Sequence, residues 1–251
     1  MTDLYPVTAM VSGVAGLASG LLVPRLIARI PEPGPDPEPE EPDPTDEADP
    51  VPLEPKELYV AVAALPGLTW KAGIAAGASA ALLGLVLGWE WSLLVVLPLV
   101  PISVALAVVD WRTRLLPTWV IAPTYVLTVG TVLLSWLLEG DLGEPESLKR
   151  ALLGWVCAGG LYLLLWFVYP RGMGYGDVRL SGILGIALGF LGWSELAVGI
   201  YGGFLLGGVV GGLLAVLRRV DRTGYPFGPF MLLGALVGIV VGQPVISALV
   251  A

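Results

Sequence analysis

The 251-residue sequence contains no histidine and only one cysteine, Cys157. Without histidine the chain has no Ser-His-Asp or Cys-His triad, no histidine metal ligand and no histidine general base. One cysteine forms no disulfide within the chain and, by itself, no metal site. Because Cys157 lies inside an apolar run, we interpret it as a small buried side chain. Catalysis by this chain would therefore depend on other groups.

Charged residues are also scarce, at 14%, whereas 56% of the residues are hydrophobic and the mean hydropathy is +0.82. A soluble domain carries about a quarter charged residues. Apolar runs of about 20 residues, long enough to cross ~30 Å of hydrocarbon, recur along the chain. The sequence predicts an all-α fold, a polytopic membrane bundle of about eight transmembrane helices. They are expected near residues 4–29, 71–89, 92–109, 118–138, 148–169, 179–192, 195–217 and 227–250.

The net charge of −8 comes from one segment. Residues 31–57 hold 11 of the 21 acidic residues, 10 prolines and one basic residue. Proline disfavours helix, and like charges repel, so this segment is predicted to be an extended linker. The expected organisation is an N-terminal transmembrane helix (1–30), an acidic, proline-rich cytoplasmic linker (31–57) and a membrane-embedded domain (58–251). No basic patch indicates nucleic acid.

Lysine and arginine favour the cytoplasmic side of a membrane. If both termini lie outside the cytoplasm, 11 of the 13 basic residues fall inside, and only Lys149 and Arg150 fall outside. The opposite orientation inverts this bias. The sequence therefore predicts a multi-pass protein with extracytoplasmic termini.

Ionisable groups beside the hydrocarbon are costly and mark candidate functional sites. Most carboxylates fall in predicted loops or near the N-terminus, which leaves Asp110 at the end of the third segment and Asp177 before the sixth. Two crossings separate them, so both are expected at the same cytoplasmic boundary.

Two neighbouring aspartates can share one proton. The ionised member takes a proton from water, and the neutral member donates one to a carbonyl oxygen. Because a helix N-terminus favours an anion, we expect Asp177 to be the base and Asp110 its protonated partner. Gly174 and Gly176 are expected to allow unusual backbone angles and close approach of another chain. Spacing alone leaves a second interpretation open, in which Asp177 only caps a helix.

Residues 173–180, which contain the GxGD motif Gly174-Tyr175-Gly176-Asp177, resemble the second catalytic motif of type IV prepilin peptidases. Residues 110–117, with an aspartate seven positions before a proline, resemble the first motif. Residues 226–230 resemble a further family segment. The similarity covers about 95–240, so 58–251 would be the peptidase domain.

The resemblance implies an aspartic endopeptidase of the bacterial inner membrane. Its substrates would be prepilins or pseudopilins, with a short basic leader before a hydrophobic helix, cut at the cytoplasmic face. The catalytic pair would be Asp110 and Asp177. The expected substrate-positioning residues are Gly174, Gly176, Arg179 and Pro117.

The sequence departs from the family in its N-terminal third, where longer members carry two CxxC pairs that bind zinc. Those members also methylate the new N-terminus with S-adenosylmethionine. Because the CxxC pairs are missing, methylation is disfavoured, and we expect no cofactor and no metal. One alternative is a proton-coupled transporter that uses the same carboxylates near the membrane centre. Another is a presenilin-type peptidase, but Val109 stands where that type has tyrosine.

Overall fold

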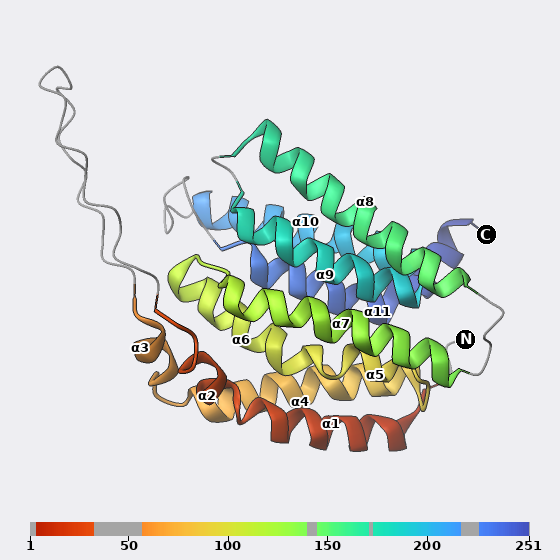
Figure 1. Ribbon diagram of the computed structural model, residues 1–251, viewed down its shortest axis with the longest axis horizontal. Coiled ribbons are helices and arrows are strands. Elements are labelled where there is room, and N and C mark those ends of the chain that lie inside the picture. Colours follow the sequence, from red (N-terminus) through yellow and green to blue (C-terminus); the bar gives the residue numbers. More distant parts are fainter. Residues whose placement is uncertain (1–3, 33–56, 140–144, 171–172, 217–225, 251) are drawn as a thin grey trace, which may run out of the picture.

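The computed structural model describes residues 4–32, 57–139, 145–170, 173–216 and 226–250, and in this part of the chain every regular element is a helix. The predicted all-α fold is therefore confirmed. Figure 1 shows the helices running nearly parallel to one another along the long axis of the molecule. They are α1 (Pro6–Gly20), α2 (Val23–Ile27), α3 (Tyr59–Ala63), α4 (Leu68–Leu87), α5 (Leu93–Val96), α6 (Leu99–Thr113), α7 (Thr118–Leu138), α8 (Glu146–Val168), α9 (Tyr175–Leu191), α10 (Trp193–Val216) and α11 (Gly228–Val250).

Within the described ranges, six spans are long and apolar enough to cross a membrane. They are α4, the run from α5 through α6, α7, α8, the described part of α10, and α11. The two other predicted segments correspond to α1, with 15 residues, and α9, with 17. These helices make the polytopic membrane bundle that the sequence predicts.

The expected single helix over 4–29 is wrong, because the chain forms α1 and α2 with a turn at Leu21 and Leu22. Pro24 has no N–H, so the carbonyl of Gly20 receives no helical hydrogen bond from the residue four positions later. Both helices still contribute to the core, since Val23 and Ile27 of α2 are buried.

The prediction that Cys157 is buried is also wrong, because its side chain is exposed on α8. The buried residues of α8 form one stripe at three- and four-residue spacing, Ala151, Gly154, Ala158 and Tyr162. Cys157 lies beside this stripe, on the face that a membrane would cover with lipid.

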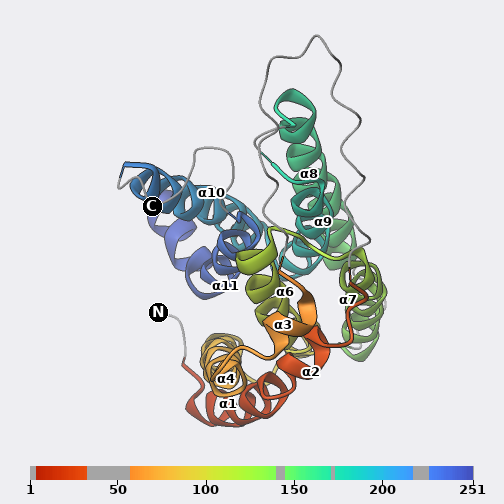
Figure 2. The same cartoon turned by 90° about the vertical axis from the view of Figure 1, so that its left-hand side faces the viewer.

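Glycines bring the helices together in three close pairs, α1 with α4, α8 with α9, and α10 with α11. A Cβ atom on Gly20 of α1 would lie 2.6 Å from the carbonyl oxygen of Ala72 in α4. In the third pair, a Cβ on Gly238 would lie 2.6 Å from the Cα of Gly199. Small residues let helix backbones approach this closely in membranes. Figure 2 shows these pairs around the central α6.

The two ends of the bundle differ in charge. One end contains α2, α3, the turn between α6 and α7 and the start of α9, and the other contains the described chain ends and the start of α8 (Figure 1). Lys149 and Arg150 lie at the second end. Six described basic residues lie at the first: Arg25, Arg29, Lys71, Arg112, Arg114 and Arg179. The other five that the sequence assigns to the cytoplasmic side, Lys56, Arg171, Arg218, Arg219 and Arg222, fall outside the described residues.

Most of the predicted acidic linker, residues 33–56, lies outside the described residues, but both of its flanks are held in place. The two carboxylate oxygens of Glu32 accept the backbone N–H groups of Tyr59 and Val60, each at 2.9 Å. Glu57 accepts two hydrogen bonds from the guanidinium of Arg112, at 2.7 and 2.8 Å. The Arg112 hydrogen bond lowers the pKa of Glu57 below its ordinary value. Both flanks therefore lie beside α3 and the end of α6.

Candidate active site

Asp110 lies in the last turn of α6, and its side chain is only 4% exposed. Its Oδ2 atom accepts the backbone N–H of Gly228, the first residue of α11, at 3.0 Å. A Cβ atom on residue 228 would lie 2.7 Å from this oxygen. Only glycine therefore lets the backbone of α11 approach the carboxylate so closely.

The chain reverses direction directly after Asp110. The N–H of Arg114 donates to the carbonyl oxygen of Asp110 at 2.8 Å, and Arg114 takes the left-handed conformation with φ of 55°. This conformation is uncommon for residues other than glycine. It ends α6 and sends the chain through Leu116 and Pro117 into α7, whose first residue is Thr118.

Asp177 lies in the first turn of α9 and is 6% exposed. Its Oδ2 atom accepts the N–H of Gly174 at 3.2 Å, and its own N–H donates to the carbonyl oxygen of Gly174 at 3.0 Å. These reciprocal bonds close the start of the helix, with Gly174 at the N-cap and Asp177 as the third helical residue, so Asp177 supports the cap without being the N-cap residue itself. The cap engages one carboxylate oxygen and leaves the other available for further chemistry.

Leu116 connects the surroundings of the two aspartates. It is buried, and its Cβ would lie 2.7 Å from a Cβ on Gly176, the residue before Asp177. Its Cδ1 would lie 3.5 Å from a Cβ on Gly228, which binds Asp110. The two carboxylates also lie close enough for their charges to interact. The structure thus brings together two carboxylates that are 67 positions apart in the chain.

A cluster of aromatic side chains lies beside Asp177. Tyr162 of α8 is buried and is subject to the charge of Asp177. Its ring stacks on Phe204 with centroids 5.0 Å apart, and Phe227 lies 6.2 Å from Tyr162 and 5.6 Å from Phe204. Apolar rings beside a buried carboxylate lower the local dielectric constant and so strengthen electrostatic interactions there.

Arg179 connects α9 to α7. Its guanidinium donates to Thr118 Oγ1 and lies over the ring of Tyr175, 5.2 Å from the centroid, while its carbonyl oxygen accepts the hydroxyl of Tyr125 at 2.8 Å. Pro117 directly precedes Thr118 and begins the helix that Arg179 contacts. These contacts fix the start of α9, and with it Asp177, against α7.

The expectation of unusual backbone angles at Gly174 and Gly176 is wrong, because neither has a positive φ. Gly176 is needed for space, since Leu116 occupies the place that a side chain would take. Around Gly174, a Cβ would meet the Asp177 carboxylate at 3.4 Å and the backbone nitrogen of Gly176 at 3.9 Å, both ordinary contact distances.

The structure weakens the helix-end argument for Asp177 as the base and Asp110 as its protonated partner. Asp110 lies at the C-terminal end of α6, but it accepts a hydrogen bond from the N-terminus of α11. Asp177 accepts one at the N-terminus of α9. At Asp110 the N-terminus of α11 therefore acts against the C-terminus of α6, so helix ends separate the two carboxylates less than the sequence suggests, and Asp177 as the base stays a prediction.

Sequence reasoning did not assign roles to Gly228, Leu116 or Tyr162. Gly228 lies in the segment 226–230, so its position between two prolines was a usable signal. Leu116 and Tyr162 carry no such signal, because their roles depend on packing between distant segments. Among the described residues, no group of three or more histidine, cysteine, aspartate or glutamate side chains could hold a metal ion.

Residues 97–242 match the model of a protein family described as the type IV leader peptidase family. This match covers more than half of the chain and includes both aspartates and Gly228. It confirms the family resemblance that the sequence motifs indicated. No solved structure matches the chain significantly.

Several curated proteins named prepilin leader peptidase/N-methyltransferase are similar to the chain. The one from Pseudomonas putida is 32% identical over 181 residues, which are 67% of this chain and 58% of that protein. The one from Pseudomonas aeruginosa is 31% identical over 188 residues, 71% and 53% of the two chains. The one from Aeromonas hydrophila is 31% identical over 164 residues, 62% and 52%. The matched region thus spans about half the length of these relatives.

Proposed function

Since the chain belongs to the type IV leader peptidase family, we propose that it is a membrane aspartic endopeptidase whose catalytic groups are Asp110 and Asp177. The observation that carries this proposal is the pair of buried carboxylates, each bound by a backbone N–H at a helix N-terminus. Beside each carboxylate is a glycine, Gly228 or Gly176, that packs against Leu116.

The cleavage proceeds by direct attack of water. One aspartate is ionised and takes a proton from water, while the other is neutral and donates its proton to the carbonyl oxygen of the scissile bond. The tetrahedral intermediate then breaks its C–N bond, and the amine leaves with a proton from the pair. Water is divided between the two products, and no covalent enzyme intermediate forms. Because both carboxylates have similar backbone partners, either can begin as the base.

The substrates we propose are prepilins, which the names of the relatives give for those proteins, or the related pseudopilins. Cleavage would take place at the cytoplasmic face of the bacterial inner membrane, and both chain ends would be extracytoplasmic. The six described basic residues at the end of the bundle with the aspartates support this orientation.

The proposed cleavage uses no cofactor and no metal, because two carboxylates and water supply every proton transfer. The relatives are also named N-methyltransferases, but our proposal does not extend to methylation with S-adenosylmethionine. The sequence contains one cysteine and so lacks the two CxxC pairs that longer family members carry.

The position of the carboxylates supports a peptidase over a proton-coupled transporter. Transporters of that kind place ionisable groups near the membrane centre, on helices that break there. Asp110 is in the last turn of α6, and Asp177 is in the first turn of α9. A site at one end of the bundle serves chemistry in one compartment.

Co-expression with a prepilin tests the proposal. The native chain should convert the prepilin to the shorter mature form, and Asp110→Asn or Asp177→Asn should each lower processing by at least ~100-fold, the contribution of a general acid or base. Glu146→Gln is the matched control, because this carboxylate is exposed at the opposite end of the bundle. Processing that continues in both aspartate variants, at native protein levels in the membrane, contradicts the proposal.

A further inference from the structure

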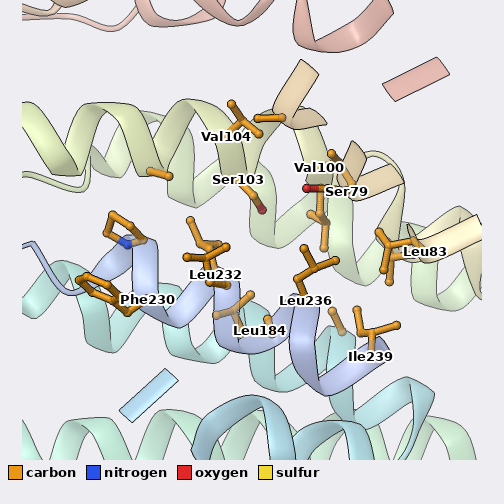
Figure 3. Close-up of a pocket in the computed structure, with 18 of the residues that line it drawn as sticks. Ser79, Leu83, Val100, Ser103, Val104, Leu184, Phe230, Leu232, Leu236 and Ile239 are labelled. Atoms are coloured by element: carbon orange, nitrogen blue, oxygen red, sulfur yellow. The ribbon is translucent and has the colours of Figure 1, made fainter. Parts of the chain in front are cut away.

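An apolar groove with a volume of about 480 Å³ runs along the bundle, with α4 and α6 on one side and α9 and α11 on the other (Figure 3). Figure 3 shows Val100, Ser103 and Val104 of α6 on one side of it, with Leu232 and Leu236 of α11 on the other. The rim is open, since Ala75 of α4, Trp111 of α6 and Leu233 of α11 are exposed.

The groove ends beside the candidate active site. It ends at Trp111, Pro229 and Phe230. Trp111 directly follows Asp110, and Pro229 directly follows Gly228, whose N–H binds Asp110. The rings of Trp111 and Phe230 have centroids 6.3 Å apart and mark this end of the groove. One end of the groove therefore lies beside the residues that flank and hold Asp110.

The dimensions fit one side of a helix. From Val100 to Trp111 the groove follows α6 for about 16 Å, at 1.5 Å per residue. This is about three helical turns, half of the ~30 Å hydrocarbon core. A polypeptide in this region has to satisfy its own backbone hydrogen bonds, so it has to be helical there.

Two of the helices that line the groove, α4 and α6, carry small residues at the spacing that favours helix packing. Ala75 and Ser79 line the groove from α4, and Ser103 and Ala107 line it from α6, each pair four positions apart. Small residues at this spacing admit the backbone of another helix, and serine hydroxyls can hydrogen-bond across the contact. An acyl chain needs neither feature, so the walls favour a helix over a lipid.

We propose that this groove holds the hydrophobic helix of the substrate, with its end at Trp111 and the scissile bond at Asp110 and Asp177. The inference rests on the proposed peptidase function and adds the binding surface for the membrane part of the substrate. The groove would thereby set which peptide bond is cut, by fixing where the helix ends.

Filling the groove tests this inference. The probe is a prepilin in nanodiscs, compared with a peptide of the same leader and cleavage sequence that ends five residues after the cut. In Ala107→Leu and Ala75→Leu, the ratio of kcat/KM for the full prepilin to that for the short peptide should fall ~10-fold, which corresponds to ~1.4 kcal/mol of lost binding. Ala78→Leu is the matched control on α4, because Ala78 is exposed but does not line the groove.

The outcomes separate the two proposals. If Asp110→Asn cleaves neither substrate and the groove variants keep the native ratio of kcat/KM between the full prepilin and the short peptide, the groove inference is overturned. The peptidase proposal is then still supported. Native cleavage of both substrates in Asp110→Asn contradicts the peptidase itself.

Crosslinking supplies a second measurement that does not depend on cleavage. The background for this experiment carries Asp110→Asn, Asp177→Asn and Cys157→Ala. In it, Ser103→Cys is tested against a series of prepilins that each have one cysteine along the hydrophobic helix. Crosslinks should recur at every third or fourth position, because one face of the helix lies in the groove. Ala78→Cys is the control and should give at least ~10-fold less product, since its position is outside the groove. Equal crosslinking at both positions, or crosslinking of Ser103→Cys to a photoactivatable lipid only, rejects the substrate helix as the occupant.

Discussion

The two buried aspartates are held by different parts of the molecule. Asp177 accepts its backbone hydrogen bond from Gly174, three residues earlier, within the first turn of its own helix. Asp110 accepts its bond from Gly228, 118 residues later, at the start of another helix. One carboxylate is therefore positioned by local sequence, and the other by the packing of α11 against α6.

This difference explains where the sequence signal is dense. The glycines around Asp177 act on the helix start that carries it, so they appear beside it in the chain. The residue that matters most for Asp110 lies in a segment that the chain reaches only after four further helices. Substitutions on the two sides should therefore fail in different ways.

The largest effect should come from removing the carboxylates together. We expect the Asp110→Asn and Asp177→Asn double variant to be no less active than either single variant, each down by at least ~100-fold. Groups that act as one unit are not additive. Single-turnover cleavage of a purified prepilin measures this. A double variant that is a further ~100-fold worse would show that the aspartates act independently.

Alanine at the two glycines separates the local from the distant support. Gly228→Ala places a methyl group 2.7 Å from Asp110 Oδ2, so the carboxylate has to move, and we expect kcat to fall ~10- to 100-fold. Gly174→Ala meets the Asp177 carboxylate at 3.4 Å and should cost less than ~5-fold. Gly130→Ala is the control, since among the described residues no atom beyond its own stretch of helix lies within 4 Å of the added carbon. Equal losses at 174 and 228 would contradict the distinction.

The contact shared by both sides should affect stability more than chemistry. Gly176→Ala directs a methyl group at Leu116, 2.7 Å from its Cβ, and overpacking of this kind costs about 1–3 kcal/mol. Thermal unfolding in detergent should show a lower Tm. A Leu116→Gly background should recover part of the Gly176→Ala loss, because glycine removes the Cβ atom that the methyl group meets. If it recovers none, Leu116 is not the obstacle.

The smallest effect should come from the ion pair beside the site. The pKa of Glu57 is lowered by its hydrogen bond to Arg112, so its contribution to stability is present above the ordinary glutamate pKa of 4.5 and is lost as the pH falls through the lowered value. Because the pair is partly exposed, Glu57→Gln should change the free energy of unfolding by less than ~1 kcal/mol at neutral pH. The difference in Tm from the native chain should vanish in acid. A difference that persists there would assign it to something other than charge.

The sequence was sufficient to predict the long helices from α4 onward, because the length of an apolar run is a property of the chain itself. The break between α1 and α2 was also open to prediction, since Pro24 stands in the run. The locations of Asp110 and Asp177 at one end followed from counting membrane crossings. The hydrogen bond from the N–H of Gly228 to Asp110 and the packing of Leu116 against Gly176 could not be predicted, because they depend on how distant helices pack.

The anchoring of Glu32 and Glu57 has a consequence for how this protein can vary. Glu32 contacts the N–H groups of Tyr59 and Val60, so the chain leaves the bundle and re-enters it at almost the same point. Lengthening a loop whose ends already meet costs little free energy, about 0.6 kcal/mol for each doubling. The connection between these two flanks should accept a shorter linker or an inserted folded domain without disturbing the helices next to it. It is therefore a suitable site for domain insertion in this protein.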